Sequence, residues 1–325
     1  MLVEIEAKVA RGQAGLEVAK PQTPALTVSA LCMRWLEECG GPQIKDLTRY
    51  RSTAQTALRR VLPLIGNVQA SSLKLVDLER LRNQLCTRYR SNTVRAALRP
   101  LGTCLSWAVR VGLLAQSPQK GLELPRRESS LEYLTLDEAR RLLSLAEERA
   151  RTTDRAVDWS RAVAIAIALR QGLRRGEIFG LRWQDIDLAS GRMSVMRSYR
   201  QTPKSGLVRH LPLHSALIPL LTDWQSRCPK TPERLVCPVQ TKQGFGMSGR
   251  RVAHGLPKLL RDAACQPLTR GFHALRHTFA SQFIMQGGNI LTLQKLLGHA
   301  DLRMTLVYSH LAPDFLSHEL ERLRY

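Results

Sequence analysis

The sequence lacks any apolar run long enough to cross a membrane. Its longest clearly apolar run, from Ala162 to Leu169, is far short of the roughly 18 residues that a spanning helix needs. The first twenty residues carry charged side chains at intervals, which excludes the apolar core of a secretory signal. We therefore expect a cytoplasmic protein with no membrane partner.

Motifs for metal and nucleotide cofactors are also missing. The seven cysteines are dispersed and include no C-x-x-C pair, so neither a disulfide framework nor a zinc ribbon is indicated. The sequence has no G-x-x-x-x-G-K-[ST] loop and no acidic cluster. We expect neither a metal nor ATP, and no other cofactor.

Acidic residues are scarce in long stretches of the chain. The protein has 49 Lys and Arg against 27 Asp and Glu, a formal net charge of +22 and a pI of about 10.6. No acid lies between Glu79 and Glu123 or from Leu188 to Thr222, and only Asp262 interrupts the stretch from Arg234 to Ala300. A surface for a polyanion needs such acid-free segments, so the charge pattern favours nucleic acid as the partner.

The N-terminal third reads as a helical domain. The whole chain of 325 residues is long enough for two domains. In this N-terminal part we expect an extension at 1–24, a helical domain at 25–118 and a linker at 119–130. One helix should begin at an N-cap among Ser91, Asn92 and Thr93, with Pro100 predicting a kink or a later start. The basic side chains here that we expect to bind DNA are Arg88, Arg90, Arg95, Arg99 and Arg110.

The second domain is expected at 131–325. Thr135 and Glu138 form a capping box at the start of a helix from Leu136 to about Arg149. Residues 160–181 alternate as a strand would, but the intervening alanines favour a buried helix. Two β-like runs, 193–199 and 207–213, predict a hairpin with Lys204 near its tip, and the chain reads as helical from His273 onward. The fold class is therefore mainly α with a small β-hairpin.

Several polar residues of this second domain are unremarkable when they are taken singly. Arg174 and Glu177 could be a surface pair one helical turn apart. His273 and Arg276 share a helix face, and a lone histidine of this kind is more often a packed residue than a catalyst. Tyr308 is one of six tyrosines, most of which should serve packing.

Their order and spacing together carry more information. The chain reads Gly172-Leu-Arg-Arg-Gly-Glu177, then Lys204 before Leu-Pro-Leu213, then His273-Ala-Leu-Arg276, then Leu297-Gly-His299, with Tyr308 nine residues later. This pattern resembles the tyrosine recombinase (phage integrase) family, and the resemblance covers about residues 25–312. It implies a helical, SAM-like core-binding domain followed by a mixed α/β catalytic domain.

The resemblance also implies a role for each matching residue. Arg174 and Arg276 would clamp the scissile phosphate, which suits planar guanidinium groups because they address pairs of oxygens. Tyr308 would attack phosphorus, form a 3′-phosphotyrosyl link and free a 5′-hydroxyl. His273 would accept the proton, and His299 would donate a hydrogen bond to the phosphate. Two further roles complete the set: Lys204 as general acid for the departing 5′-oxygen, and Glu177 as the residue that orients Arg174 or His273.

The partners follow from the same resemblance. They would be double-stranded DNA core sites, with two protomers on each site and a homotetramer on two sites, assisted by DNA-bending or directionality factors. Such an enzyme would be nucleoid-associated and would serve the integration or excision of a mobile element. The tail at 309–325 has an apolar stripe, Leu316, Leu320 and Leu323, that would cover either its own domain or a neighbour.

Three other functions stay open. His273 and His277 have an i, i+4 spacing that suggests zinc, although the glutamate of H-E-x-x-H is missing. The segment 279–308 has helix, Gly-Gly turn and helix character, as in a helix-turn-helix regulator without catalysis. A type IB topoisomerase would use the same chemistry without exchanging DNA partners.

Overall fold

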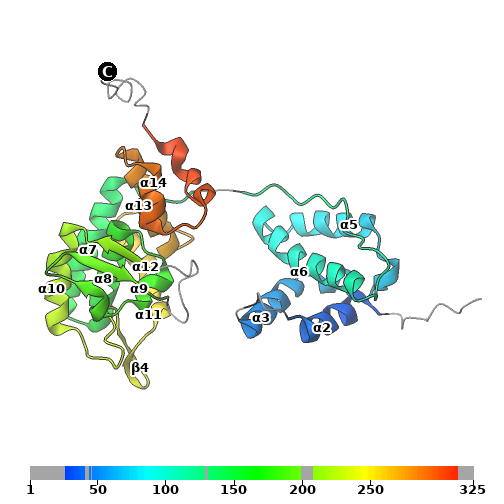
Figure 1. Cartoon of the computed structure of the whole chain (residues 1–325), viewed down its shortest axis with the longest axis horizontal. Helices are drawn as coiled ribbons and strands as arrows, with labels where there is room; N and C mark the ends of the chain where they lie inside the picture. Colours follow the sequence, from blue (N-terminus) through cyan, green and yellow to red (C-terminus); the bar gives the residue numbers. More distant parts are fainter. Residues whose placement is uncertain (1–25, 41–43, 45, 129–130, 199–207, 314–325) are drawn as a thin grey trace, which may run out of the picture. The chain divides into compact units, whose positions relative to one another are not determined.

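The structure is a computed structural model that describes residues 26–40, 44, 46–128, 131–198 and 208–313. Its contacts divide the chain into two units, Met1–Ser129 and Ser130–Tyr325 (Figure 1). Lys204, the expected extension at 1–24 and the leucine stripe of the tail lie outside the described residues. No helix in the described part is long and apolar enough to cross a membrane.

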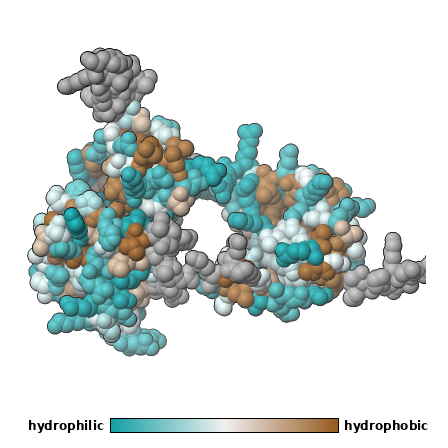
Figure 2. All heavy atoms as spheres, in the orientation of Figure 1, coloured by the Kyte–Doolittle hydropathy of each residue, from teal (hydrophilic) through white to brown (hydrophobic). Residues whose placement is uncertain are grey.

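The N-terminal unit is a helical bundle built around one long helix. Its elements are α2 (Val28–Glu38), α3 (Leu47–Leu58), α4 (Leu62–Ile65), η1 (Ala70–Ser72), α5 (Leu75–Cys86) and α6 (Ser91–Arg110). Helix α6 packs against α2, α3 and α5 and buries an apolar stripe that includes Val94, Leu101 and Leu105. On the visible faces of both units, hydrophilic side chains surround smaller hydrophobic patches (Figure 2).

The start of α6 differs from the sequence-based expectation. Arg90 occupies the N-cap position without a capping side chain, and the helix runs through Pro100 to Arg110. The backbone N–H of Ser91, in the first turn of α6, instead donates a hydrogen bond of 3.4 Å to a carboxylate oxygen of Glu128, which is 37 residues away in the chain. A long-range acceptor thus replaces the local cap that we expected.

The polar segment that follows α6 is held against the helices of its own unit. The side chain of Asn92 donates to the carbonyl of Glu128 at 2.7 Å, and Arg95 donates to the carbonyl of Pro125 at 2.9 Å. Arg82 of α5 donates to the carbonyl of Glu123 at 2.9 Å. The expected linker therefore packs on the N-terminal unit over most of its length.

The C-terminal unit is mainly helical with a small antiparallel sheet within residues 186–212, as the sequence predicts. A second small sheet, at residues 239–246, is not part of that expectation. Its helices are α7 (Leu136–Thr153), α8 (Ala156–Gln171), α9 (Arg175–Gly180), α10 (Ile218–Arg227), α11 (Gly249–His254), α12 (Leu256–Asp262), α13 (Phe272–Met285) and α14 (Ile290–Leu297). Its short 3₁₀ segments are η2 (Trp183–Asp185), η3 (Ser215–Leu217), η4 (Leu302–Met304) and η5 (Leu306–Leu311). The sheets are β1 (Ile186–Asp187), β2 (Arg192–Val195) and β3 (Arg209–Pro212), and β4 (Val239–Thr241) with β5 (Gly244–Gly246).

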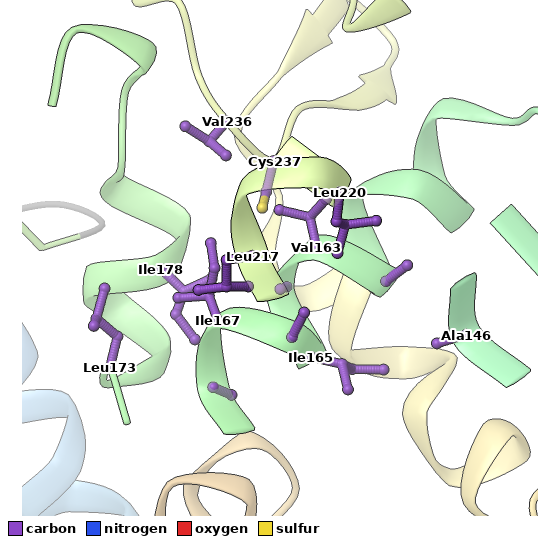
Figure 3. Packing of buried hydrophobic residues seen from close by; sticks show 14 of the residues in the cluster. Ala146, Val163, Ile165, Ile167, Leu173, Ile178, Leu217, Leu220, Val236 and Cys237 are labelled. Atoms are coloured by element: carbon purple, nitrogen blue, oxygen red, sulfur yellow. The ribbon is translucent and has the colours of Figure 1, made fainter. Parts of the chain in front are cut away.

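Helix α8 lies at the centre of this unit and packs against α7, α13, α9 and α11. Its residues from Ala162 to Ala168 are at most 1% exposed, so the apolar alternation belongs to a helix that is buried all round. Val163 and Ile167 lie beside Leu217 and Leu220 in the core (Figure 3).

The expected capping box is present, since Thr135 and Glu138 bond each other's backbone N–H groups at the start of α7.

Strand β3 brings a charged side chain into the core. It pairs antiparallel with β2, so that Val195 lies opposite Arg209 and Met193 opposite Leu211. Arg209 and Leu211 are 8% and 6% exposed, whereas His210 between them is exposed. Because alternate residues of a strand share a face, Arg209 points into the interior beside apolar neighbours.

Candidate active site

The ends of two helices meet and present their backbone carbonyls to arginine side chains. Gly172 is the C-cap of α8 and Gly298 is the C-cap of α14; both are in the left-handed conformation, with φ of 63° and 62°. Arg276 of α13 donates to the carbonyl of Gly172 at 2.7 Å and to that of Leu297 at 2.8 Å. The last carbonyls of a helix lack partners within it and carry partial negative charge, so they are suited to bind a cation.

Arg174 lies at the same helix ends. Its guanidinium donates to the carbonyls of Leu297 and Gly298 at 3.4 and 3.3 Å. Its side chain is 22% exposed, whereas the side chain of Arg276 is 3% exposed. Arg276 is therefore fixed in the interior of the unit, while Arg174 is fixed at the edge of the interior and reaches solvent.

One carboxylate, Glu177 of α9, links the arginines. Arg209 binds it with two parallel hydrogen bonds of 3.1 and 3.0 Å, and Arg174 donates at 3.0 Å. Arg276 lies 3.9 Å from the same carboxylate. The backbone N–H of Arg174 also donates to Glu177 at 2.8 Å, which caps the start of α9.

The site carries more positive than negative charge. Burial by itself would raise the pKa of Glu177, but hydrogen bonds and charge from Arg209 and Arg174 outweigh it, and the pKa lies below its usual value. Burial and the charge of Arg174 lower the pKa of Arg276 to about 9, so this guanidinium stays protonated at neutral pH. Three guanidinium groups thus face one carboxylate, and the excess is suited to an anion.

His299 lies between Arg276 and the chain that leads to η5. Its Nε2 is 3.0 Å from Arg276 Nη2, and its Nδ1 is 2.9 Å from the hydroxyl of Thr305. Burial and the charge of Arg276 lower the pKa of His299 to about 4. Since a guanidinium only donates, Nε2 accepts and the proton of the neutral ring lies on Nδ1. The expected donation to a phosphate would need Nε2 to leave Arg276 and take up a proton.

Tyr308 is buried in η5, against α13. Its hydroxyl is 2.6 Å from Nδ1 of His277, one turn after His273 on α13, and its side chain is 2% exposed. Burial raises the pKa of Tyr308 to about 12, against the lowering effect of the positive charge of Arg276. The phenol is therefore protonated at neutral pH and lies within the field of the arginines.

The two histidines of α13 have no third metal ligand among the described residues. The rings of His273 and His277 are 4.5 Å apart and nearly perpendicular, and Nδ1 of His277 is engaged by the phenol. Among the residues that the structure describes, no group of three or more His, Cys, Asp or Glu could hold a metal ion. His273 itself is exposed.

The structure thus brings together most of the expected catalytic residues. Direct contacts join Glu177 to Arg174 and Arg276, and Arg276 to His299. Tyr308 lies in η5, three residues after Thr305, whose hydroxyl contacts His299. The expected DNA-binding arginines belong to the N-terminal unit. Four of them are exposed, while Arg95 is half-buried and bound to Pro125.

Sequence reasoning does not assign three residues to this site: Arg209, Thr305 and His277, the last of which it considers only as part of a zinc pair. For Arg209 a signal was present, because the arginine alternates with Leu211 and Leu213 on the apolar face of a predicted strand. The partners of His277 and Thr305 depend on how η5 folds back on α13, which no local pattern encodes.

Comparisons with known proteins identify the family of the chain. The model of the phage integrase family matches residues 132–314. Tyrosine recombinase XerC of Xanthomonas campestris pv. campestris (strain B100) is 30% identical over 263 residues, which is 78% of this chain and 76% of XerC. A XerC-like tyrosine recombinase of Caldanaerobacter subterraneus subsp. tengcongensis is 26% identical over 289 residues, 79% of this chain and 72% of that protein.

Solved structures share the fold at low sequence identity. The Tn1549 transposon integrase in complex with a circular intermediate DNA has a TM-score of 0.71 and 21% identity, and the match covers 92% of this chain and all of that one. A lambda integrase tetramer bound to a Holliday junction has a TM-score of 0.70 and 14% identity, with 96% of this chain and 85% of that one covered. From the family match and the extent of identity with XerC, the chain belongs to the phage integrase family of tyrosine recombinases.

Proposed function

We propose that this protein is a site-specific tyrosine recombinase that cleaves and rejoins DNA through a 3′-phosphotyrosyl link to Tyr308. The observation that carries the proposal is the cluster of three guanidinium groups around Glu177. A phosphodiester under attack develops charge on two non-bridging oxygens, and preorganised donors that meet this charge lower the barrier. The excess positive charge at Glu177 supplies such donors.

Arg174 and Arg276 are the groups that would contact the phosphate. Both are fixed through helix carbonyls, so their positions are set before DNA arrives. Arg209 has both terminal nitrogens on Glu177, so it would act by holding that carboxylate and, through it, Arg174. A rigid second layer of this kind keeps catalytic groups within reach of the transition state.

The proposed reaction is a balanced exchange of two phosphate ester bonds. The phenolic oxygen of Tyr308 forms a bond to phosphorus while the bond from phosphorus to the 5′-oxygen breaks. The phenolic proton passes to an acceptor, for which His273 is proposed, and Lys204 protonates the departing 5′-oxygen. His299 would donate to the phosphate after its release from Arg276. Because the link conserves the ester bond, rejoining needs no ATP, and the arginines supply the charge that a metal would supply elsewhere.

Replacing Tyr308 by Phe tests the nucleophile. We expect the variant to bind cognate DNA with the affinity of the wild type and to form no covalent link, because the phenolic oxygen is the attacking atom. The measurement is denaturing electrophoresis of the protein with nicked DNA from the flanks of the encoding element, in EDTA. Tyr133→Phe, which removes a half-buried hydroxyl of the same unit, is the control. A protein-linked fragment in the Tyr308→Phe lane would contradict the assignment.

The proposed biological role is integration or excision of a mobile element by four protomers on two DNA sites, with accessory factors that set the direction. Two cognate sites on one plasmid separate this role from that of a type IB topoisomerase. A recombinase yields exchanged products, whereas a topoisomerase only relaxes supercoils. A helix-turn-helix regulator would bind these sites and yield neither product.

A further inference from the structure

The hydroxyl that the proposed function uses as nucleophile already has a specific partner. His277 Nδ1 lies 2.6 Å from the phenolic oxygen of Tyr308, and the two rings are tilted by 49° at 5.8 Å between centroids. The tyrosine is 2% exposed and His277 is half-buried, so the contact is largely shielded from solvent. No role for His277 in the reaction follows from the sequence motif, in which it is the residue after Arg276.

The histidine is suited to accept a hydrogen bond from the phenol. Burial and the nearby charge of His273, Arg270 and Arg276 lower the pKa of His277 to about 4, against an opposing effect of Glu132. The ring is therefore neutral at neutral pH, and its Nδ1 can accept from a hydroxyl. In that state the ring proton lies on Nε2, which is buried and makes no hydrogen bond within the described part of the chain.

The short segment that carries the nucleophile, η5, buries little of itself apart from Tyr308. Segment η5 is a six-residue 3₁₀ run, longer than such helices usually are, and Leu306 and Val307 are 44% and 45% exposed. It packs against α13, where Tyr308 is its buried residue. A polar anchor at the hydroxyl therefore fixes the end of the side chain that must be aimed.

We propose that His277 is a positioning residue for the nucleophile: its Nδ1 accepts the hydrogen bond of the Tyr308 hydroxyl and holds it in one place beside Arg276. The inference rests on the proposed function of Tyr308 and adds a residue to it. His277 acts through Tyr308 and need not touch the DNA. Proton transfer to His277 is not part of this role, because the surrounding positive charge makes it a weak base.

Two substitutions separate the hydrogen bond from the shape of the ring. His277→Phe keeps an aromatic ring but removes the acceptor, whereas His277→Asn presents an amide oxygen near the position of Nδ1. We expect His277→Phe to slow covalent attachment to saturating DNA by about 10- to 100-fold without changing DNA affinity, and His277→Asn to restore most of the rate. The exposed His254→Asn is the matched control and should equal the wild type.

The pH profile distinguishes this role from a structural one. A hydrogen bond from the neutral phenol to an acceptor stabilises the protonated form and raises its pKa. The attachment rate should rise with pH as the phenol loses its proton. In His277→Phe, which lacks the acceptor, this rise should move to lower pH, and in His277→Asn it should lie again at the pH of the wild type. A merely structural role would lower the rate at every pH alike, and that result, or a rate equal to that of the wild type, overturns the proposal.

A measurement on DNA-free protein keeps the inference separate from the proposed function. N-acetylimidazole acylates accessible phenols, and peptide mass spectrometry reads each tyrosine, with the exposed Tyr89 as internal reference. We expect Tyr308 to react several-fold faster in His277→Phe than in the wild type or His277→Asn; equal reactivity in all three overturns the anchoring role. If the wild type forms no link to DNA while this pattern holds, the proposed function fails and the hydrogen bond stands.

Discussion

At the residue scale, Glu177 is the charge on which the site depends. It is 2% exposed and bound to two arginines, with a third 3.9 Å away. Glu177→Gln removes the negative charge and leaves three buried or half-buried cations facing one another. We expect a loss of about 3 kcal/mol in the free energy of unfolding at pH 7, as for other buried pairs that lose one partner. Urea denaturation measures it.

The pH dependence of this loss has a definite sign. The pKa of Glu177 is lowered in the folded protein, so its stabilising effect is complete above the unfolded pKa of about 4.3 and disappears as the pH falls through the folded pKa. The difference between wild type and Glu177→Gln should therefore shrink below about pH 4. Glu148→Gln, at an exposed position of α7, should show no such difference. A gap that stayed constant down to pH 3 would contradict this account.

Which residues meet at Glu177 could be predicted only in part. The pairing with Arg174 is local, three positions apart on one helix start, and the spacing shows it. The pairing with Arg209 joins residues 32 positions apart and depends on how β3 packs beside α9. The sequence marks Arg209 as a charge on an apolar face but does not say which carboxylate satisfies it.

At the element scale, the end of α14 fits against Arg209 with no room to spare. Gly298 has a φ of 62°, and a Cβ added there would lie 2.4 Å from Nη1 and 2.5 Å from Cδ of Arg209. Gly298→Ala must therefore shift either the Arg209 side chain or the end of α14, which disturbs the Arg209–Glu177 pair, in addition to the cost of a left-handed alanine. We expect the rate of covalent attachment to fall by at least about tenfold.

A matched glycine isolates the steric part of this effect. Gly191 has a φ of 63°, and nothing lies within 4 Å of an added Cβ. Gly191→Ala thus shares the backbone strain, about 1 kcal/mol, without the contact with Arg209. Its stability should fall modestly and its attachment rate should match that of the wild type. If the two variants behave alike, the packing of Gly298 on Arg209 does not matter to the site.

The elements themselves show what local patterns can and cannot predict. Helix α7 follows from its capping box, and α8 from alanines between β-branched residues, because both signals concern neighbours in the chain. The start of α6 was misjudged, since its donor is satisfied by Glu128, 37 residues away. Segment η5 carries no periodic signal, and only its packing on α13 reveals the partner of Tyr308.

At the scale of the whole molecule, the net charge of +22 predicts a DNA affinity that falls steeply with salt, since each neutralised phosphate releases counterions. Arg99 of α6 is exposed, whereas Arg95 donates to the carbonyl of Pro125. If Arg99 contacts a phosphate, Arg99→Ala should weaken binding and reduce the slope of log K against log salt by about 1. Fluorescence anisotropy over a range of salt concentrations measures both.

Two further variants decide whether the N-terminal arginines act as DNA contacts or as structural groups. Arg34 is paired with Glu38 at 2.7 Å, so Arg34→Ala should leave the salt slope unchanged. Arg95→Ala frees the carbonyl of Pro125 and should also lower the stability of the N-terminal unit, by about 1 kcal/mol. If the slope of log K against log salt keeps its wild-type value in Arg99→Ala, this arginine does not contact DNA. The positive charge of the N-terminal unit would then serve solubility.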